Sequence, residues 1–231
     1  MSSEATAPAT SIVLVEDHTM VAEAFTAAFD REPDLAVVGL ATSVAEAERV
    51  VNRTNPDLAV IDFRLPDGDG ADAVLRVRQR CPDIRTLIVT SATDDRSLTR
   101  SLGVDADGYL LKDQPLEELL DGVRTVAAGG AAYAPALLVR LLQRSGRTAT
   151  SHVPQLSDRE GEVLHLLASG RSTAEMADEL HLSVNTVRNH VQGVITKLGT
   201  HSRIEAVAVG VREGLIAPPT GEPPRSRTTQ T

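Results

Sequence analysis

The sequence contains very little cysteine and no long hydrophobic run. Cys81 is the only cysteine among 231 residues, so the chain can form neither an intramolecular disulfide nor a cysteine metal cluster. No apolar stretch is long enough to be a transmembrane candidate. The N-terminus lacks the basic start and apolar stretch of a secretory signal. We therefore expect a cytoplasmic protein that has no membrane partner.

Basic side chains are also scarce, and the acidic excess is unevenly distributed. The net charge of −9 argues against a protein that coats nucleic acid indiscriminately. Residues 11–130 hold 22 acidic and 12 basic side chains, whereas residues 152–217 hold 8 acidic and 6 basic ones. Any DNA contact in the second half must therefore depend on where individual side chains lie.

Short β-rich runs recur through the first half of the chain, at residues 11–15, 35–40, 58–61, 85–90 and 108–111. Segments with helical spacing separate them. One of these segments begins with a possible capping box, Ser43 with Glu46, and the last one ends at Gly129. Strands that alternate with helices predict a five-stranded parallel sheet with helices on both faces.

The pattern changes after residue 130. Residues 131–155 contain a helical arm, "PALLVRLLQR" at residues 135–144, followed by a small, polar linker, and residues 156–216 have helical spacing throughout. The polar ends of the chain, residues 1–10 and 217–231, predict disordered tails. The sequence thus predicts an α/β domain over residues 11–130, followed by an all-α domain of four helices.

Acidic residues stand at the ends of two predicted strands. Glu16 and Asp17 follow the first strand, and Asp62 follows the third. Ligands of open α/β sheets bind at the carboxyl ends of the strands. If the two strands are neighbours, their carboxylates repel one another and need a cation, for which Mg²⁺ is the natural candidate because it prefers oxygen ligands.

Two further strand ends carry groups of complementary chemistry. Thr90, with Ser91 beside it, can donate a hydroxyl hydrogen, and Lys112 offers an ammonium group. The chain has only two lysines against 21 arginines, so a lysine at this position is notable. A divalent ion, a hydroxyl and an ammonium group together suit a phosphoryl group, and a carboxylate can attack its phosphorus.

Residues 11–130 resemble the receiver domain of two-component response regulators. The matching motifs, in order, are "ED" at Glu16 and Asp17, "DFRLPDGDG" from Asp62, "VTS" at Thr90, and "DGYLLKD" at residues 107–113. The resemblance implies a flavodoxin-like, doubly wound fold in which Asp62 is the phosphoacceptor.

The same resemblance implies roles for the other residues of the motifs. Mg²⁺ would be held by Asp17, Asp62, the backbone carbonyl of Arg64 and, through water, Glu16. The phosphoryl group would be bound by Lys112 and by Thr90, with Ser91 as the competing hydroxyl, while Tyr109 would be the aromatic residue that changes rotamer.

The second half of the chain predicts a helix-turn-helix. Capping boxes at residues 157–160 and 172–175 begin the first two helices. A short turn leads to a third helix that begins at Ser183, and a fourth helix spans residues 202–213.

The third helix carries two stripes of different chemistry. Apolar residues expected to face the core are Val187, Val191, Val194, Ile195 and Leu198. A second stripe has groups that suit base edges in a major groove, and it consists of Asn185, Arg188, Asn189 and Gln192. A solvated polar face is the alternative interpretation of this stripe.

Residues 156–216 resemble the LuxR-type helix-turn-helix through the motifs "LSDREGEVL", "ADELHLSVNTVRNHV" and "KLGTHSR". The resemblance implies phosphate contacts or framing of the helix at Thr186, His190 and Lys197, and base contacts at Arg188, Asn189 and Gln192. Gly193 is an unfavourable residue inside the third helix, since glycine lowers helix stability by about 1 kcal/mol relative to alanine. Close packing against another helix would explain it.

A receiver followed by a LuxR-type domain is the arrangement of the NarL/FixJ-like response regulators. The resemblance implies a transcription regulator, not an enzyme, that a sensor histidine kinase phosphorylates on Asp62. Phosphorylation would favour a homodimer, or release the recognition helix, so that two copies bind double-stranded promoter DNA.

Two alternatives come from other classes of protein. A phosphatase of the haloacid-dehalogenase kind needs a second aspartate two residues after the nucleophile, and this chain has Arg64 there. A regulator that binds DNA or a partner without phosphorylation is left open by the sequence.

Overall fold

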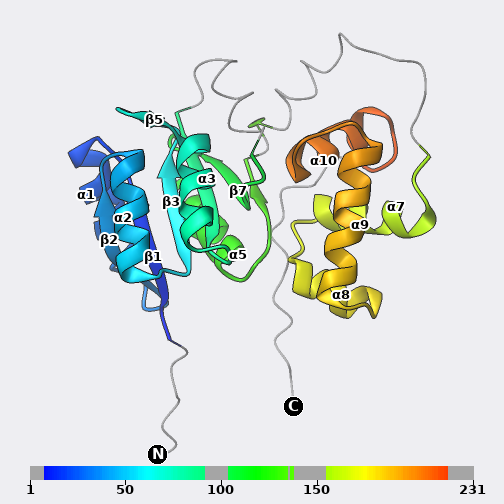
Figure 1. Ribbon diagram of the computed structural model, residues 1–231, viewed down its shortest axis with the longest axis horizontal. Coiled ribbons are helices and arrows are strands. Elements are labelled where there is room, and N and C mark those ends of the chain that lie inside the picture. Colours follow the sequence, from blue (N-terminus) through cyan, green and yellow to red (C-terminus); the bar gives the residue numbers. More distant parts are fainter. Residues whose placement is uncertain (1–7, 92–103, 135, 138–154, 218–231) are drawn as a thin grey trace, which may run out of the picture. The chain divides into compact units, whose positions relative to one another are not determined.

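The computed structural model describes residues 8–91, 104–134, 136–137 and 155–217 (Figure 1). The chain divides into two compact units, Met1–Ala127 and Ala128–Thr231, which are described separately below. Most of the predicted arm, linker and tails lies outside the described residues.

A parallel sheet forms the centre of the first unit. Its main strands are β1 (Thr10–Val15), β2 (Leu35–Ala41), β3 (Leu58–Asp62), β6 (Arg85–Thr90) and β7 (Gly108–Leu111). Their order in the sheet is β2-β1-β3-β6-β7, which is the flavodoxin-like order. A further short strand, β8 (Ala132–Tyr133), lies beyond the boundary of the first unit and was not predicted, because two residues are too short to show a period.

Helices cover the sheet on both faces, as predicted. They are α1 (Thr19–Phe29), α2 (Val44–Thr54), α3 (Gly70–Arg80) and α5 (Leu116–Ala127). Figure 1 shows α2 and α3 together in front of the sheet, and these two helices contact each other. The central strand β3 is buried along its whole length, which is why its sequence is a continuous apolar run up to Asp62.

The capping box predicted at the start of α2 is only half formed. The Ser43 hydroxyl accepts a hydrogen bond from Glu46 N at 3.1 Å, but the Glu46 carboxylate accepts from Thr42 N at 2.8 Å and not from Ser43 N. Asp67 completes the cap from a distant loop, because its carboxylate accepts from the first two N–H groups of α2 at 2.7 and 3.0 Å.

The acidic "DGDG" loop after β3 also caps helices. The loop begins as an antiparallel ribbon of β4 (Arg64–Leu65) and β5 (Gly68–Asp69). Asp69 then forms a capping box with Asp72 at the start of α3. A Cβ on Gly70 would lie 3.0 Å from the Asp62 carbonyl oxygen, so the chain needs glycine to pass this close behind Asp62.

Four helices of the second unit match the predicted ones. They are α7 (Asp158–Ala168), α8 (Thr173–Leu180), α9 (Val184–Lys197) and α10 (Arg203–Arg212). Both capping boxes are formed in full, and Ser183 and Ser202 are the N-caps of α9 and α10. The predicted apolar stripe of α9 is buried, where α9 contacts α7, α8 and α10. None of the helices in the described part of the chain has the length and apolar character of a membrane span.

Candidate acidic site and nucleic-acid interface

Four adjacent strands bring the predicted site residues to one edge of the sheet. β1, β3, β6 and β7 are neighbours in that order. Val15 pairs with Ile61, Asp62 with Val89, and Thr90 with Leu111. The residues that end these strands therefore lie in one row, as the strand-end pattern predicted.

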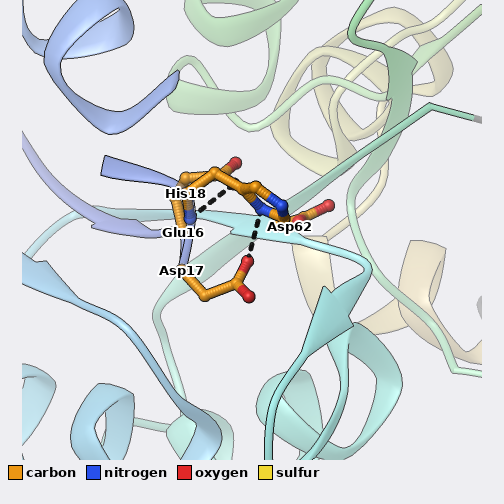
Figure 2. A group of neighbouring side chains, drawn as sticks. All are labelled: Glu16, Asp17, His18 and Asp62. Carbon is orange, nitrogen blue, oxygen red and sulfur yellow. Dashed lines mark hydrogen bonds and ion pairs between the residues drawn. The ribbon is translucent and has the colours of Figure 1, made fainter. Parts of the chain in front are cut away.

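Three carboxylates meet at this edge. The residues Glu16 and Asp62 are buried, at 2% and 6% exposed, whereas Asp17 is exposed. One ligand atom from each of these residues and one from His18 all lie within 4.8 Å of one another (Figure 2). Clustered carboxylate oxygens are the donors that a hard divalent cation prefers, so this group can hold a metal ion.

Lys112 is the cation that joins the two buried carboxylates. Its Nζ lies 2.5 Å from Glu16 Oε2 and 3.0 Å from Asp62 Oδ2, and its side chain is mostly buried. Breaking such a buried pair leaves a charge without compensation, which is strongly unfavourable. Among the residues that the structure describes, the site therefore has three carboxylates and one ammonium group, and this excess of negative charge matches a divalent cation.

His18 belongs to the cluster and was not predicted from the sequence. Its Nδ1 lies 2.8 Å from Asp17 Oδ1 and 3.3 Å from Glu16 Oε1 (Figure 2). The imidazole is 69% exposed and caps the outer side of the acidic group. The available signal was its position immediately after the acidic pair at a strand end.

The remaining predicted residues of this site take different positions. Thr90 is buried at the end of β6, and its carbonyl accepts from Lys112 N at 2.9 Å, whereas Ser91 is exposed. Tyr109 is buried on β7, where its hydroxyl donates to the Val104 carbonyl. The Arg64 side chain is exposed on β4, two residues beyond Asp62.

The polar stripe of α9 is exposed as predicted. Asn185, Arg188, Asn189 and Gln192 are all exposed, while Thr186 and His190 are partly buried on its flanks. Thr186 N donates to the Ser183 hydroxyl at 3.1 Å, which fixes the start of the helix. The exposed groups are those that can read base edges from within a major groove.

Lys197 takes a different position from these residues. Its Nζ lies 2.7 Å from Glu160 Oε2, on α7. A Cβ on Gly193, one turn earlier on α9, would lie 3.1 Å from Glu160 Oε1. Close packing against another helix therefore accounts for the glycine inside α9.

Comparison with known proteins assigns a family to both units. Residues 12–124 match the response regulator receiver domain, and residues 154–209 match the bacterial regulatory proteins of the luxR family. The response regulator protein VraR of Staphylococcus aureus is 31% identical over 205 residues, which cover 89% of this chain and 98% of VraR. The chain belongs to the response regulator family. Response regulators of this kind regulate transcription through their DNA-binding domain and are not enzymes.

Solved structures of other response regulators have a similar fold. ChrA, from a heme-sensing two-component system, has a TM-score of 0.52 at 28% identity, with 91% of this chain and all of ChrA covered. A LuxR-family response regulator from Aurantimonas sp. SI85-9A1 has a TM-score of 0.55 at 30% identity, covering 59% of this chain and 98% of that one. RcsB of Salmonella typhimurium, at 20% identity and a TM-score of 0.55, covers 87% of this chain and 97% of RcsB and shows the fold alone.

Proposed function

We propose that this response regulator is phosphorylated on Asp62 by a sensor histidine kinase and that phosphorylation favours a DNA-binding dimer. The observation that carries the proposal is the meeting of Asp62, Glu16, Asp17 and Lys112 at one sheet edge. Several carboxylates that share one lysine suit a phosphoryl-binding site, whereas a structural ion pair needs only one carboxylate for each lysine.

In the proposed reaction, an Asp62 carboxylate oxygen attacks the phosphorus of a phosphohistidine. A P–O bond forms, the P–N bond breaks, and the histidine nitrogen leaves with the electron pair. Lys112, 3.0 Å from the Asp62 carboxylate, is placed to pair with the phosphoryl oxygens that arrive there.

The proposal includes a divalent cation, for which Mg²⁺ is the candidate because it prefers oxygen ligands. Asp17, Asp62 and the backbone carbonyl of Arg64 would hold it, with Glu16 acting through water. When bound, it would supply positive charge that the phosphoryl oxygens need during transfer. The negative excess among the described residues of the cluster supports a divalent ion at this edge.

The switch residues would respond to the new charge at Asp62. Thr90 stands at the end of the neighbouring strand β6, so its hydroxyl is the first candidate to bond the phosphoryl group, and the exposed Ser91 is the second. Tyr109, buried on β7 beside β6, would change rotamer as Thr90 moves. Such a change shifts an existing equilibrium between two states.

A groove of about 390 Å³ beside the acidic cluster supports access for a kinase. Its lining includes Glu16 and, on α1 and β2, Ala22 and Leu40. Leu40 is 50% exposed, and Met20 at the start of α1 is 84% exposed. Exposed apolar side chains on the Glu16 side of the acidic cluster suit the surface of a kinase that brings its phosphohistidine to Asp62.

DNA binding would use the exposed stripe of α9. Arg188, Asn189 and Gln192 are proposed to contact base edges. Asn185, Thr186 and His190 are proposed to lie near the sugar-phosphate backbone of the DNA. The recognition helix of a helix-turn-helix places its N-terminal residues against the bases, and a dimer places two such helices on two half-sites. The solved structure of two RcsB dimers bound to two parallel DNAs is a precedent in a protein of the same fold.

The test uses the full chain, a duplex selected from a random pool by that chain, and a small-molecule phosphodonor with Mg²⁺. Wild type should acquire one phosphoryl group, form more dimer in sedimentation, and bind the duplex more tightly. Asp62→Asn should do none of these, while Asp83→Asn, an exposed carboxylate outside the cluster, should behave as wild type. Equal DNA affinity with and without phosphodonor would favour a regulator that acts without phosphorylation.

A further inference from the structure

The structure separates Lys197 from the other cations and amides of the recognition helix. Lys197 stands in the last turn of α9, about 18 Å along the helix from Asn185 at 1.5 Å per residue. At 100° per residue, it also lies roughly 140° around the helix from Gln192, although within about 20° of the face that carries Thr186 and His190. Lys197 is therefore separated from the proposed base-contact stripe, and its own contacts decide whether it touches a DNA phosphate.

The Lys197 ammonium group forms an ion pair with Glu160 on α7. Lys197 Nζ lies 2.7 Å from Glu160 Oε2, and the same oxygen accepts from Ser157 N at 2.7 Å and from the Ser157 hydroxyl at 2.9 Å. Glu160 is 8% exposed. One buried carboxylate thus ties the first turn of α7 to the last turn of α9.

Gly193 is an independent sign that α9 is shaped around this carboxylate. Gly193 and Lys197 are four residues apart and share a face of the helix. A side chain at 193 would meet Glu160 Oε1 at 3.1 Å, closer than an ordinary contact. Glycine inside a helix is unfavourable, so its presence here is explained by room for Glu160.

From these contacts we infer that Lys197 is a positioning residue, which Glu160 holds to orient the recognition helix, and is not a phosphate contact. The inference rests on the proposed DNA binding by α9. Family resemblance implied either a phosphate contact or framing of the helix at Lys197, and the inference selects the second role and names Glu160 as the residue that provides it.

Salt dependence distinguishes the two roles. Removing one cation that touches a duplex phosphate lowers the slope of log affinity against log salt by about 0.9. The experiment measures affinity of the full chain for its selected duplex over a range of salt, for wild type, Lys197→Met, Glu160→Gln and the double variant. Arg212→Met, which removes another cation of the same unit, is the control for net charge.

The expected result is an affinity loss of roughly threefold to tenfold in either single variant, with the wild-type slope retained. The double variant should lose no more than either single one, because both remove the same link. A slope lowered by about 0.9 in Lys197→Met overturns the inference, as does unchanged affinity in both single variants. If wild type binds no duplex at all, the proposed function itself has failed.

Discussion

Lys112 Nζ and Asp62 Oδ2 lie 3.0 Å apart, across the carboxyl edge of the sheet. The same ammonium group is 2.5 Å from Glu16 Oε2, so a single cation holds together the two buried carboxylates of the site. β6 separates β3, which ends at Asp62, from β7, which Lys112 follows. The lysine must therefore reach across the end of β6, which places Thr90 beside this ion pair.

Lys112→Met is expected to destabilise the receiver strongly. The Glu16 side chain is only 1% exposed and would lose its cation, which costs on the order of 3–5 kcal/mol. Chemical denaturation of the full chain measures this loss, and Mg²⁺ should recover more stability in the variant than in wild type. Arg76→Met is the control, since its 3.7 Å pair with Glu48 is at the surface and is worth less than about 1 kcal/mol. Equal losses in the two variants would contradict the prediction.

Arg188→Ala is expected to weaken and broaden DNA recognition. An arginine that reads a guanine contributes about 1–3 kcal/mol of discrimination, so affinity for the selected duplex should fall by that amount. Competition with duplexes altered at single base pairs should show relaxed preference at one position. Arg212→Ala, on α10, should leave that preference unchanged. A uniform loss at all positions would instead indicate a phosphate contact.

The stability of the helical unit should fall in acid through Glu160. The Lys197 ammonium, and then the hydrogen bonds from Ser157, lower the pKa of Glu160 from 4.5 to about 2. Between these pH values the unfolded chain binds more protons than the folded one, so stability present above pH 4.5 is lost as the pH falls towards 2. Since Lys197 is half exposed, we expect a loss on the order of 1–2 kcal/mol.

Thermal unfolding of the helical unit between these pH values measures the loss from Glu160. Glu160→Gln should flatten this part of the pH profile relative to wild type, while Glu162→Gln, an exposed position on the same helix, should not. Parallel profiles for wild type and Glu160→Gln would show that the Glu160 pair adds nothing to stability.

The effect of Gly193→Ala on the free energy of unfolding should depend on which residue stands at position 160. Alanine improves helix propensity by about 1 kcal/mol, but its Cβ would meet Glu160 Oε1 at 3.1 Å in the wild-type background. The substitution is therefore expected to be neutral or destabilising alone and stabilising by about 1 kcal/mol in a Glu160→Ala background. Unfolding free energies of the four proteins test this, and equal effects in both backgrounds would refute the link.

Local structure could largely be predicted from the sequence. The five main strands, the four helices of the second unit and their capping boxes depend on residues within a few positions of one another. The alternation of strands and helices also placed Glu16, Asp62, Thr90 and Lys112 at strand ends, and in a parallel sheet such ends share an edge. The prediction of a converging site followed from this rule once β1 and β3 were neighbours.

By itself, then, the sequence determined which residues end the strands and which stripes of the helices are apolar, because periodicity and capping act over short distances. Only the tertiary structure decided which side chains meet. The Glu46 carboxylate accepts from Thr42 N, and Asp67 completes the N-terminal cap of α2. His18 joins the acidic cluster, and Lys197 pairs with Glu160. These contacts depend on how elements pack and on rotamers within that packing, neither of which leaves a periodic signal in the chain.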